Sequence, residues 1–365
     1  MTGEKSGARG ARTVAEVGEF ALIARINAGR PLSSGVLLGP GDDAAVVAAP
    51  TGRFVVTTDM LVQDRHFRLD WSSAVDIGRK AIAQNAADVV AMGARPSAFV
   101  VGLGCPSETA AEFVEGLADG MWAEIARSGG AIAGGDMVRS PYVTISVTAF
   151  GDPYREPILR SGARPGDVVA VAGRLGWAGA GFAVLSAGFV DATAAAAIAS
   201  NGPSGVAASG TTGAAGDASP ERDALALDAV DAGLIADVLA AHRVPRPPYE
   251  AVLGLPGDAP ITALTDVSDG LLADLGHIAE SSRVAIDLDS GALRDPALEP
   301  LAAALGADPL DWILAGGEDH AFAATFAGNG DLPAGWVPIG RVVEGAGVTL
   351  DGTPRIGPTG WESFA

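Results

Sequence analysis

Segments with the composition of β-strands alternate with segments of helical periodicity along the first part of this chain. The β-rich segment 53–58 precedes a helical pattern over 75–92, and the apolar segment 97–103 precedes a second helical pattern over 110–127. An alternating segment, 142–150, follows them. Strands and helices interleaved in this way predict layers of helix on sheet, in the α/β or α+β class.

Length and a change of composition predict two domains. The chain has 365 residues, and domains commonly hold about 150 residues. Pro, Gly and charged residues become frequent after Gly151, where we place the boundary. We therefore expect a flexible lead-in over 1–13, a first domain over 14–150 and a second domain over 151–365. The Gly-, Ser- and Ala-rich tract 200–223 lacks apolar periodicity, and we expect a flexible insertion there.

The charge balance excludes several classes of partner. The chain carries 24 basic and 44 acidic residues, a net charge of −20, so we expect neither a nucleic-acid nor a membrane partner. An acidic chain favours metal cations instead. The single cysteine, Cys105, forms no internal disulfide and no signal peptide is apparent, which together predict the cytoplasm.

Lysine is almost absent, which excludes further chemistry. Lys5 and Lys80 are the only lysines, and neither follows a glycine as a P-loop requires. Schiff-base catalysis therefore has almost no candidates. The G-x-S-x-G and H-E-x-x-H motifs are absent as well.

Acidic residues recur at glycine-rich turns or where strands are expected to end. They occur in the segments GDD (Asp42, Asp43), TTD (Asp59), GGD (Asp136), TDVSDG (Asp266, Asp269) and GGED (Glu318, Asp319), with Asp88 on the helix over 75–92. Hard oxygen ligands of this kind suit Mg²⁺, and so many carboxylates close together without a cation would repel one another. Any one of them could instead form a turn, and Ser268 fits a helix N-cap.

These segments resemble those of thiamine-monophosphate kinases. The strings GDDAAVV, TTDMLVQDRHF, GRKAIAQNAADVVAMGA, AGGDMVRS, LRSGARPGD, DVSDGLLADLGHI, GGEDHAF and a closing GW-x-x-F occur in order from Gly18 to Phe364. This family belongs to the ATP-binding superfamily that includes aminoimidazole ribonucleotide synthetase. The resemblance implies an α/β fold of two domains: an N-terminal mixed-sheet domain for ATP, Mg²⁺ and dimerisation, and a C-terminal α/β domain.

The resemblance also implies roles for individual residues. Several Mg²⁺ ions would be held by Asp43, Thr57, Thr58, Asp59, Asp88, Asp136, Asp266 and Asp269, the six aspartates among them being catalytic. ATP, the co-substrate, would contact Gly135, Asp136, Arg160 and Ser268. Thiamine monophosphate would contact His66, Glu318 and Trp361. A homodimer is implied, formed through the sheet of the first domain.

The implied reaction agrees with the composition. Phosphoryl transfer needs positioning and charge neutralisation, which metals and arginine supply where no P-loop lysine exists. The acceptor phosphate is largely ionised at pH 7, so direct in-line attack needs no general base. His320 and the pair Met137 and Val138 depart from the family pattern. Another ATP-dependent enzyme of the superfamily, or a non-catalytic nucleotide or thiamine-phosphate binding module, remains an alternative.

Overall fold

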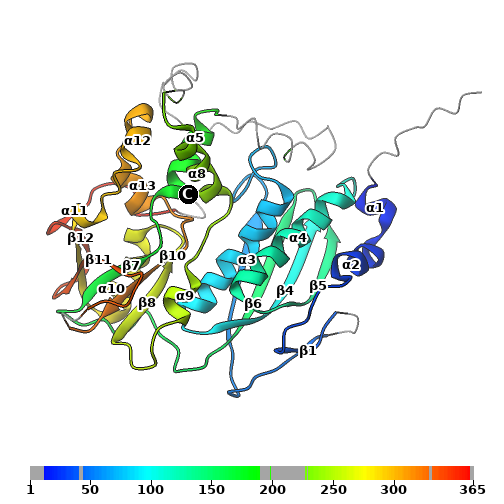
Figure 1. The fold of residues 1–365 in the computed structure, drawn as a ribbon, viewed down its shortest axis with the longest axis horizontal. Coiled ribbons are helices and arrows are strands. Elements are labelled where there is room, and N and C mark those ends of the chain that lie inside the picture. Colours follow the sequence, from blue (N-terminus) through cyan, green and yellow to red (C-terminus); the bar gives the residue numbers. More distant parts are fainter. Residues whose placement is uncertain are drawn as a thin grey trace, which may run out of the picture.

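The computed structural model describes residues 12–40, 44–189, 198, 227, 229–328 and 331–361. These residues form two halves side by side, each with one main sheet and a set of helices (Figure 1). The fold is mixed α/β, as expected. The insertion expected over 200–223 and nearly all of the expected lead-in lie outside the described residues. Within them, no helix is both long enough and apolar enough to cross a membrane.

The first half contains a mixed sheet of four strands in the order β3-β6-β4-β5. Only the β4–β5 pair is parallel. These strands are β3 (Val55–Val62), β4 (Arg95–Cys105), β5 (Ile132–Arg139) and β6 (Thr144–Asp152). The smaller elements that precede them are α1 (Val14–Val17), α2 (Glu19–Asn27), β1 (Val36–Leu38) and β2 (Val46–Val47).

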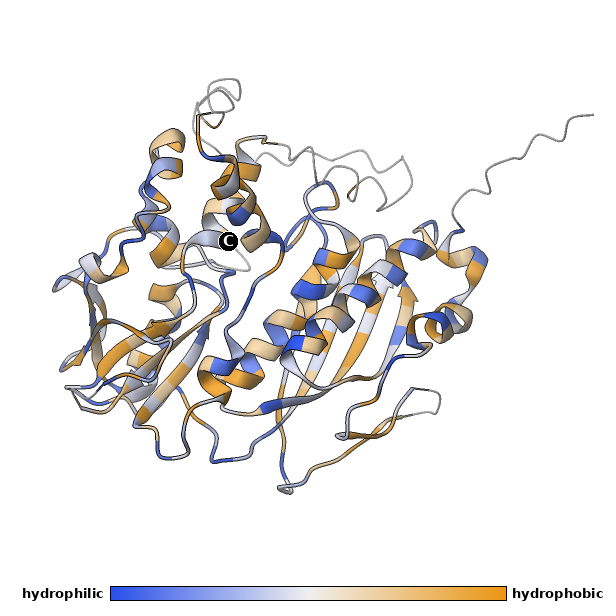
Figure 2. Ribbon diagram, viewed as in Figure 1, coloured by the Kyte–Doolittle hydropathy of each residue, from blue (hydrophilic) through white to orange (hydrophobic). Residues whose placement is uncertain are grey.

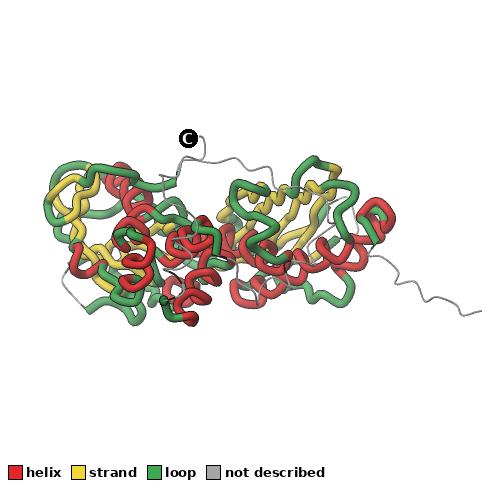
Figure 3. The backbone as a smooth tube through the Cα atoms, turned by 90° about the horizontal axis from the view of Figure 1, so that it is seen from above, coloured by secondary structure: helices red, strands yellow, loops and turns green. Residues whose placement is uncertain are grey.

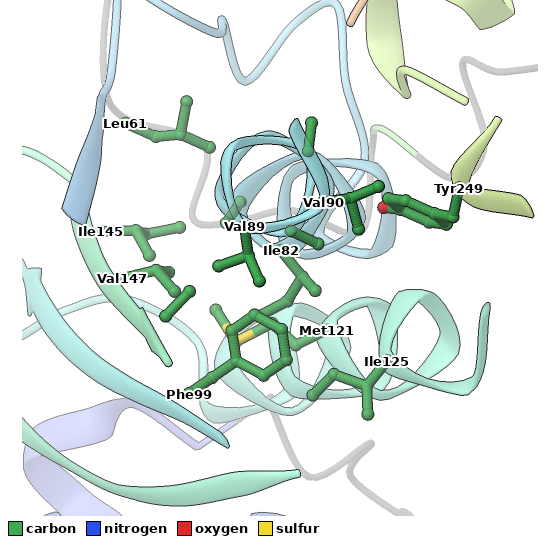
Figure 4. Close-up of a cluster of buried hydrophobic side chains, with 14 of the residues drawn as sticks. Leu61, Ile82, Val89, Val90, Phe99, Met121, Ile125, Ile145, Val147 and Tyr249 are labelled. Atoms are coloured by element: carbon green, nitrogen blue, oxygen red, sulfur yellow. The ribbon is translucent and has the colours of Figure 1, made fainter. Parts of the chain in front are cut away.

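Two long helices, α3 (Ala74–Ala91) and α4 (Ala111–Ser128), cover one face of this sheet (Figure 3). Both were predicted from their periodicity. Ser73 and Asp76 form a capping box that starts α3, because each accepts a hydrogen bond from the other's backbone N–H. Helix α3 packs against both the sheet and α4, and Ile82 and Val89 lie against Phe99 (Figure 4).

The second half contains a sheet of seven strands in the order β13-β12-β9-β11-β7-β10-β8. Its strands are β7 (Val168–Ala172), β8 (Ile261–Val267), β9 (Ala285–Leu288), β10 (Ala321–Phe326), β11 (Val337–Val343), β12 (Gly347–Leu350) and β13 (Thr353–Pro354). Its helices are α5 (Trp177–Ser186), α8 (Ala232–Arg243), α9 (Tyr249–Leu253), α10 (Leu271–Ser282), α11 (Ser290–Leu293), α12 (Glu299–Leu305) and α13 (Pro309–Ala315).

One of the two buried apolar clusters contains residues of both halves. The predicted boundary at Gly151 falls inside β6, one residue before its end. The apolar cluster around α3 also includes Tyr249 of α9 and Phe322 of β10 (Figure 4 labels Tyr249). Figure 2 shows apolar residues along the strands of both sheets. Helix α3 therefore packs against its own sheet and also against elements of the second half.

Candidate active site

Strand β3 and helix α3 bring the first group of acidic residues together. The Thr57 hydroxyl donates a hydrogen bond to Asp88 Oδ2 at 2.8 Å, and the Asp59 backbone N–H donates to Asn85 Oδ1 at 3.0 Å. Asp59 was expected where its strand ends. Instead β3 continues to Val62, because the residues after Asp59 are apolar and keep pairing with β6.

The second half contributes Asp266 and Asp269. Asp266 is buried near the end of β8. Ser268 does not cap the following helix with its side chain, since Gly270 occupies the N-cap position with a φ of 132°. The Asp274 carboxylate instead accepts the backbone N–H groups of Ser268, Asp269 and Gly270 at 3.0–3.1 Å. This arrangement fixes the backbone that carries Asp269.

Asp59, Asp88, Asp266 and Asp269, which we call the acidic cluster, form one electrostatic unit across the two halves. Burial, followed by the charges of Asp266 and Asp59, raises the pKa of Asp88 to about 7. Burial and Asp266 likewise raise the pKa of Asp269. Burial is also the main cause of the raised pKa of Asp59, with Asp266 and Asp269 adding to it. A cation would relieve this repulsion.

The carboxylate oxygens of the acidic cluster are ligands of the kind that Mg²⁺ prefers. Among the residues that the structure describes, no three acidic, histidine or cysteine side chains are grouped to hold one ion. Mg²⁺ usually binds through one or two carboxylates and completes its shell with water and substrate phosphates. Hard carboxylate oxygens that are close enough to repel one another meet that requirement.

The turn over 317–320 is held by three anchors. Glu318 Oε2 accepts a hydrogen bond from Lys80 Nζ of α3 at 2.6 Å. The Asp319 carboxylate accepts the backbone N–H groups of Gly176 and Ala178 at the start of α5, at 2.6 and 2.9 Å. His320 Nδ1 lies 3.1 Å from Asp266 Oδ2. Each of three consecutive side chains therefore contacts a different element.

Backbone conformation shows why this turn needs anchors. Gly317, Glu318 and His320 have φ values of 64°, 63° and 49°. Residues other than glycine rarely adopt positive φ values of this kind. Burial lowers the pKa of His320, but its contact with Asp266 outweighs burial and raises the pKa to about 9. His320 is therefore a charged partner of the acidic cluster.

His66 and Glu318, both expected to face the substrate, lie on either side of Lys80. Lys80 Nζ donates to the His66 carbonyl at 3.3 Å and to Glu318. Burial raises the pKa of Glu318, but Lys80 and neighbouring histidines outweigh it and lower the pKa to about 2. His66 Nδ1 accepts the Val62 N–H at 3.1 Å, which fixes the imidazole ring.

Trp361 lies beside the acidic cluster. Its backbone N–H donates to the Asp269 carbonyl at 2.8 Å, and 49% of the residue is exposed. The structure thus brings together Thr57, Asp59, Asp88, Asp266, Ser268, Asp269, His66, Glu318 and Trp361 from both halves.

Gly135 and Asp136 lie elsewhere, on strand β5 rather than in a turn. Strands β3 and β5 are opposite edges of the sheet, three strand spacings or about 14 Å apart. Asp136 and its cross-strand neighbour Gly102 line a hollow of about 280 Å³. Gly135 has a structural reason to be glycine, because a Cβ there would lie 2.2 Å from the Val101 carbonyl oxygen.

Three other expected residues also fall outside this group. The Thr58 hydroxyl donates to the Val147 carbonyl, and β-strand alternation turns its side chain away from Thr57 and Asp59. Arg160 is exposed, and its carbonyl accepts from Ser282 at the last residue of α10, about 18 Å along that helix from Asp269. Asp43 lies outside the described residues.

Lys80, His320 and Asp274 belong to the site but were not among the expected site residues. A lysine in the middle of the largely apolar helix over 75–92 was a usable signal, because a buried lysine needs a partner. Asp274 follows Gly270 by one helical turn and could have been recognised as a carboxylate near a helix N-terminus. Sequence contains no comparable signal for the contact between His320 and Asp266.

Comparison with known proteins gives consistent matches. The family described as AIR synthase related protein, N-terminal domain, matches residues 41–152. A thiamine-monophosphate kinase of Mycobacterium tuberculosis is 48% identical over 362 residues, covering 96% of this chain and 93% of the relative.

Solved structures give similar matches. The crystal structure of thiamine-monophosphate kinase from Stenotrophomonas maltophilia K279a superposes with a TM-score of 0.70 at 32% identity, covering 92% of this chain and 98% of that one. A structure of AaThiL complexed with AMPPCP and TMP gives a TM-score of 0.71 at 27% identity, covering 98% and 100%.

Proposed function

This chain belongs to the thiamine-monophosphate kinase family, and from that premise we propose how its residues carry out the reaction. It is a kinase that transfers a phosphoryl group from ATP to thiamine monophosphate, forming thiamine diphosphate. The observation that carries our proposal is the meeting of the acidic cluster from both halves with His66, Glu318 and Trp361.

The acidic cluster is the proposed site of several Mg²⁺ ions, with Thr57 hydrogen-bonded to it. Asp43, Thr58 and Asp136 stay expected ligands, although Thr58 and Asp136 lie outside the cluster within one chain. Carboxylate chemistry and mutual repulsion within the cluster support this assignment. Bound Mg²⁺ would supply the charge neutralisation that phosphoryl transfer needs. Lys80 does not replace it as a phosphate ligand, because it is 2% exposed and already paired with Glu318.

The proposed transfer is a direct in-line attack by a phosphate oxygen of thiamine monophosphate on the γ-phosphorus of ATP. The acceptor phosphate is largely ionised at neutral pH and needs no general base. The four aspartates of the acidic cluster position the reacting groups, and Ser268 lies beside the cluster, where we expect the nucleotide. His66, Glu318 and Trp361 orient the acceptor, and the exposed face of Trp361 suits a cationic thiazolium ring.

We further propose a homodimer that buries the uncovered face of the first sheet. Val56, Met60 and Val138 project from this face and are 52–59% exposed, and a second copy would cover them. The hollow that contains Asp136 opens on the same face, so Gly135 and Asp136 would bind nucleotide near the second copy. Arg160 stays an expected nucleotide contact, although within one chain it lies far from Ser268.

The free, buried Cys105 favours a location in the cytoplasm.

The decisive experiment is product analysis with the purified chain, ATP, Mg²⁺ and thiamine monophosphate. We expect thiamine diphosphate and ADP in equal amounts, and we expect Asp59→Asn to abolish both, because Asp59 belongs to the acidic cluster. Thiamine and aminoimidazole precursors serve as control acceptors. Nucleotide binding without diphosphate formation would instead indicate a non-catalytic module, and turnover of an aminoimidazole precursor would indicate another superfamily reaction.

A further inference from the structure

We propose that Lys80 is a positioning residue for the acceptor substrate, acting through Glu318 and His66. The inference rests on the proposed function, because it assumes that these two residues face thiamine monophosphate. Lys80 is not among the residues that we expected to take part in catalysis or binding. Its position in the structure, at the point where α3, the His66 segment and the 317–320 turn meet, carries the argument.

Lys80 makes two contacts that converge on the substrate side of the site. Its ammonium donates to Glu318 Oε2 at 2.6 Å and to the His66 carbonyl at 3.3 Å. The Lys80 side chain is 3% exposed, whereas that of Glu318 is 34% exposed. The lysine is thus buried behind its partner, and Glu318 keeps an accessible surface toward solvent or substrate.

Lys80 is not needed to hold the backbone of the 317–320 turn, because other contacts of the turn do so. Asp319 contacts α5 and its N-terminal backbone, and His320 contacts β8, through atoms that do not involve Lys80. The Glu318 N–H also donates to the Ser268 carbonyl at 2.6 Å. Loss of the ammonium therefore frees the Glu318 carboxylate while the backbone of the turn remains attached.

Charge also fits a positioning role. Lys80 is buried, Glu318 is partly exposed, and the two are 238 residues apart in the sequence. Their ion pair holds the Glu318 carboxylate in one position at the junction of the two halves. An unpaired charge in either position would be unfavourable. His242 faces the same pair, but burial first and Lys80 second lower its pKa to about 3, so it stays neutral and does not compete for Glu318.

Arg79, the preceding residue of α3, provides a matched control. Its Nη2 lies 3.0 Å from Glu124 Oε2, and Glu124 is fully buried. Glu124 keeps Arg127 and the Tyr249 hydroxyl as partners when Arg79 is replaced. Arg79→Met thus removes an ion pair from the same helix at a site that contacts neither His66 nor Glu318 in the structure.

The experiment measures steady-state kinetics of Lys80→Met, Arg79→Met, Glu318→Gln and the Lys80→Met/Glu318→Gln double variant, with thermal unfolding of each. We expect Lys80→Met to raise the KM for thiamine monophosphate about tenfold or more, with the KM for ATP changed by less than about twofold. Arg79→Met should change neither KM. Because the closer contact of Lys80 is with Glu318, most of its effect should pass through that residue. The loss in the double variant should therefore fall well below the sum of the two single losses.

Each other outcome has a definite meaning. An unchanged KM for thiamine monophosphate in folded Lys80→Met, equal shifts in both KM values, or additive losses in the double variant would overturn the inference. If Lys80→Met does not fold, Lys80→Gln replaces it. That variant keeps a hydrogen-bond donor but removes the positive charge that pairs with Glu318, and an unchanged KM for thiamine monophosphate there would overturn the inference equally. A wild-type chain that makes no thiamine diphosphate would refute the proposed function instead.

Discussion

Asp88 shows most clearly how the fold keeps a side chain in an unfavourable environment. Its carboxylate is half-buried on α3, accepts a hydrogen bond from Thr57, and faces Asp59 and Asp266. Burial and these charges raise its pKa from 3.8 to about 7. Without a cation, ionisation of Asp88 therefore opposes folding, which is typical of sites where function rather than stability selects the residue.

The first prediction concerns Asp88→Asn in metal-free protein. Because the folded-state pKa lies above the unfolded value, the wild type loses stability as pH rises from about 4 to about 7. The variant lacks this loss, so its Tm should exceed that of the wild type by an amount that grows across this range. Scanning calorimetry in EDTA measures the difference.

Added Mg²⁺ completes this test. It should raise the Tm of the wild type more than that of Asp88→Asn, while the variant loses kinase activity. Asp258→Asn, at an exposed carboxylate, is the control and should change neither the Tm nor its response to Mg²⁺. A lower Tm for Asp88→Asn at pH 7 in EDTA would contradict our account of the acidic cluster.

At the scale of elements, the crossing of α3 and α4 sets the position of Asp88 and Lys80. Gly78 of α3 and Gly120 of α4 allow the helix backbones to approach closely. A Cβ on Gly78 would lie 2.0 Å from the Leu117 carbonyl oxygen, and one on Gly120 would lie 2.1 Å from the Val75 carbonyl oxygen. The two helices would have to separate to admit either methyl group.

Gly78→Ala should therefore destabilise the protein by about 2 kcal/mol, despite the higher helix propensity of alanine. Gly276→Ala in α10 is the opposite case, since nothing lies within 4 Å of the added Cβ. It should stabilise the protein by about 0.5–1 kcal/mol. Urea unfolding of both variants measures the free energies, and a neutral Gly78→Ala would mean that the helices can shift without cost.

At the scale of the whole molecule, the two halves act as a single unit around the site. The core around α3 includes residues of both sheets, and Glu124 of α4 accepts a hydrogen bond from Tyr249 of α9 at 3.1 Å. This shared core keeps the carboxylates of the first half opposite Asp266 and Asp269. The other face of the first sheet remains uncovered, with Val56 and Met60 exposed.

Replacing Val56 and Met60 together with aspartate should convert the proposed homodimer to a monomer, because charged groups would have to be buried at the interface. Light scattering coupled to size-exclusion chromatography measures the mass. Arg283→Ala, at an exposed residue of the second half, is the control and should stay dimeric. A monomeric wild type would refute the proposed interface.

Local patterns were sufficient to predict α3, α4 and the acidic segments, because helical periodicity and glycine-rich turns depend on residues close together in the sequence. They also supported the family resemblance, which the comparisons confirm. Strand lengths were predicted less well. Asp59 and Asp136 lie inside strands, because pairing with β6 and β4 extends both segments beyond their local signals.

Tertiary structure alone decided which of the predicted residues meet. Only the packing of α3 between the halves pairs Lys80 with Glu318, and only the 317–320 turn places His320 against Asp266. Asp136 shares the glycine-rich setting of the other aspartates but lies at the far edge of the sheet. Burial and long-range contacts set the pKa values and partners of these groups, and neither is encoded by neighbours in the sequence.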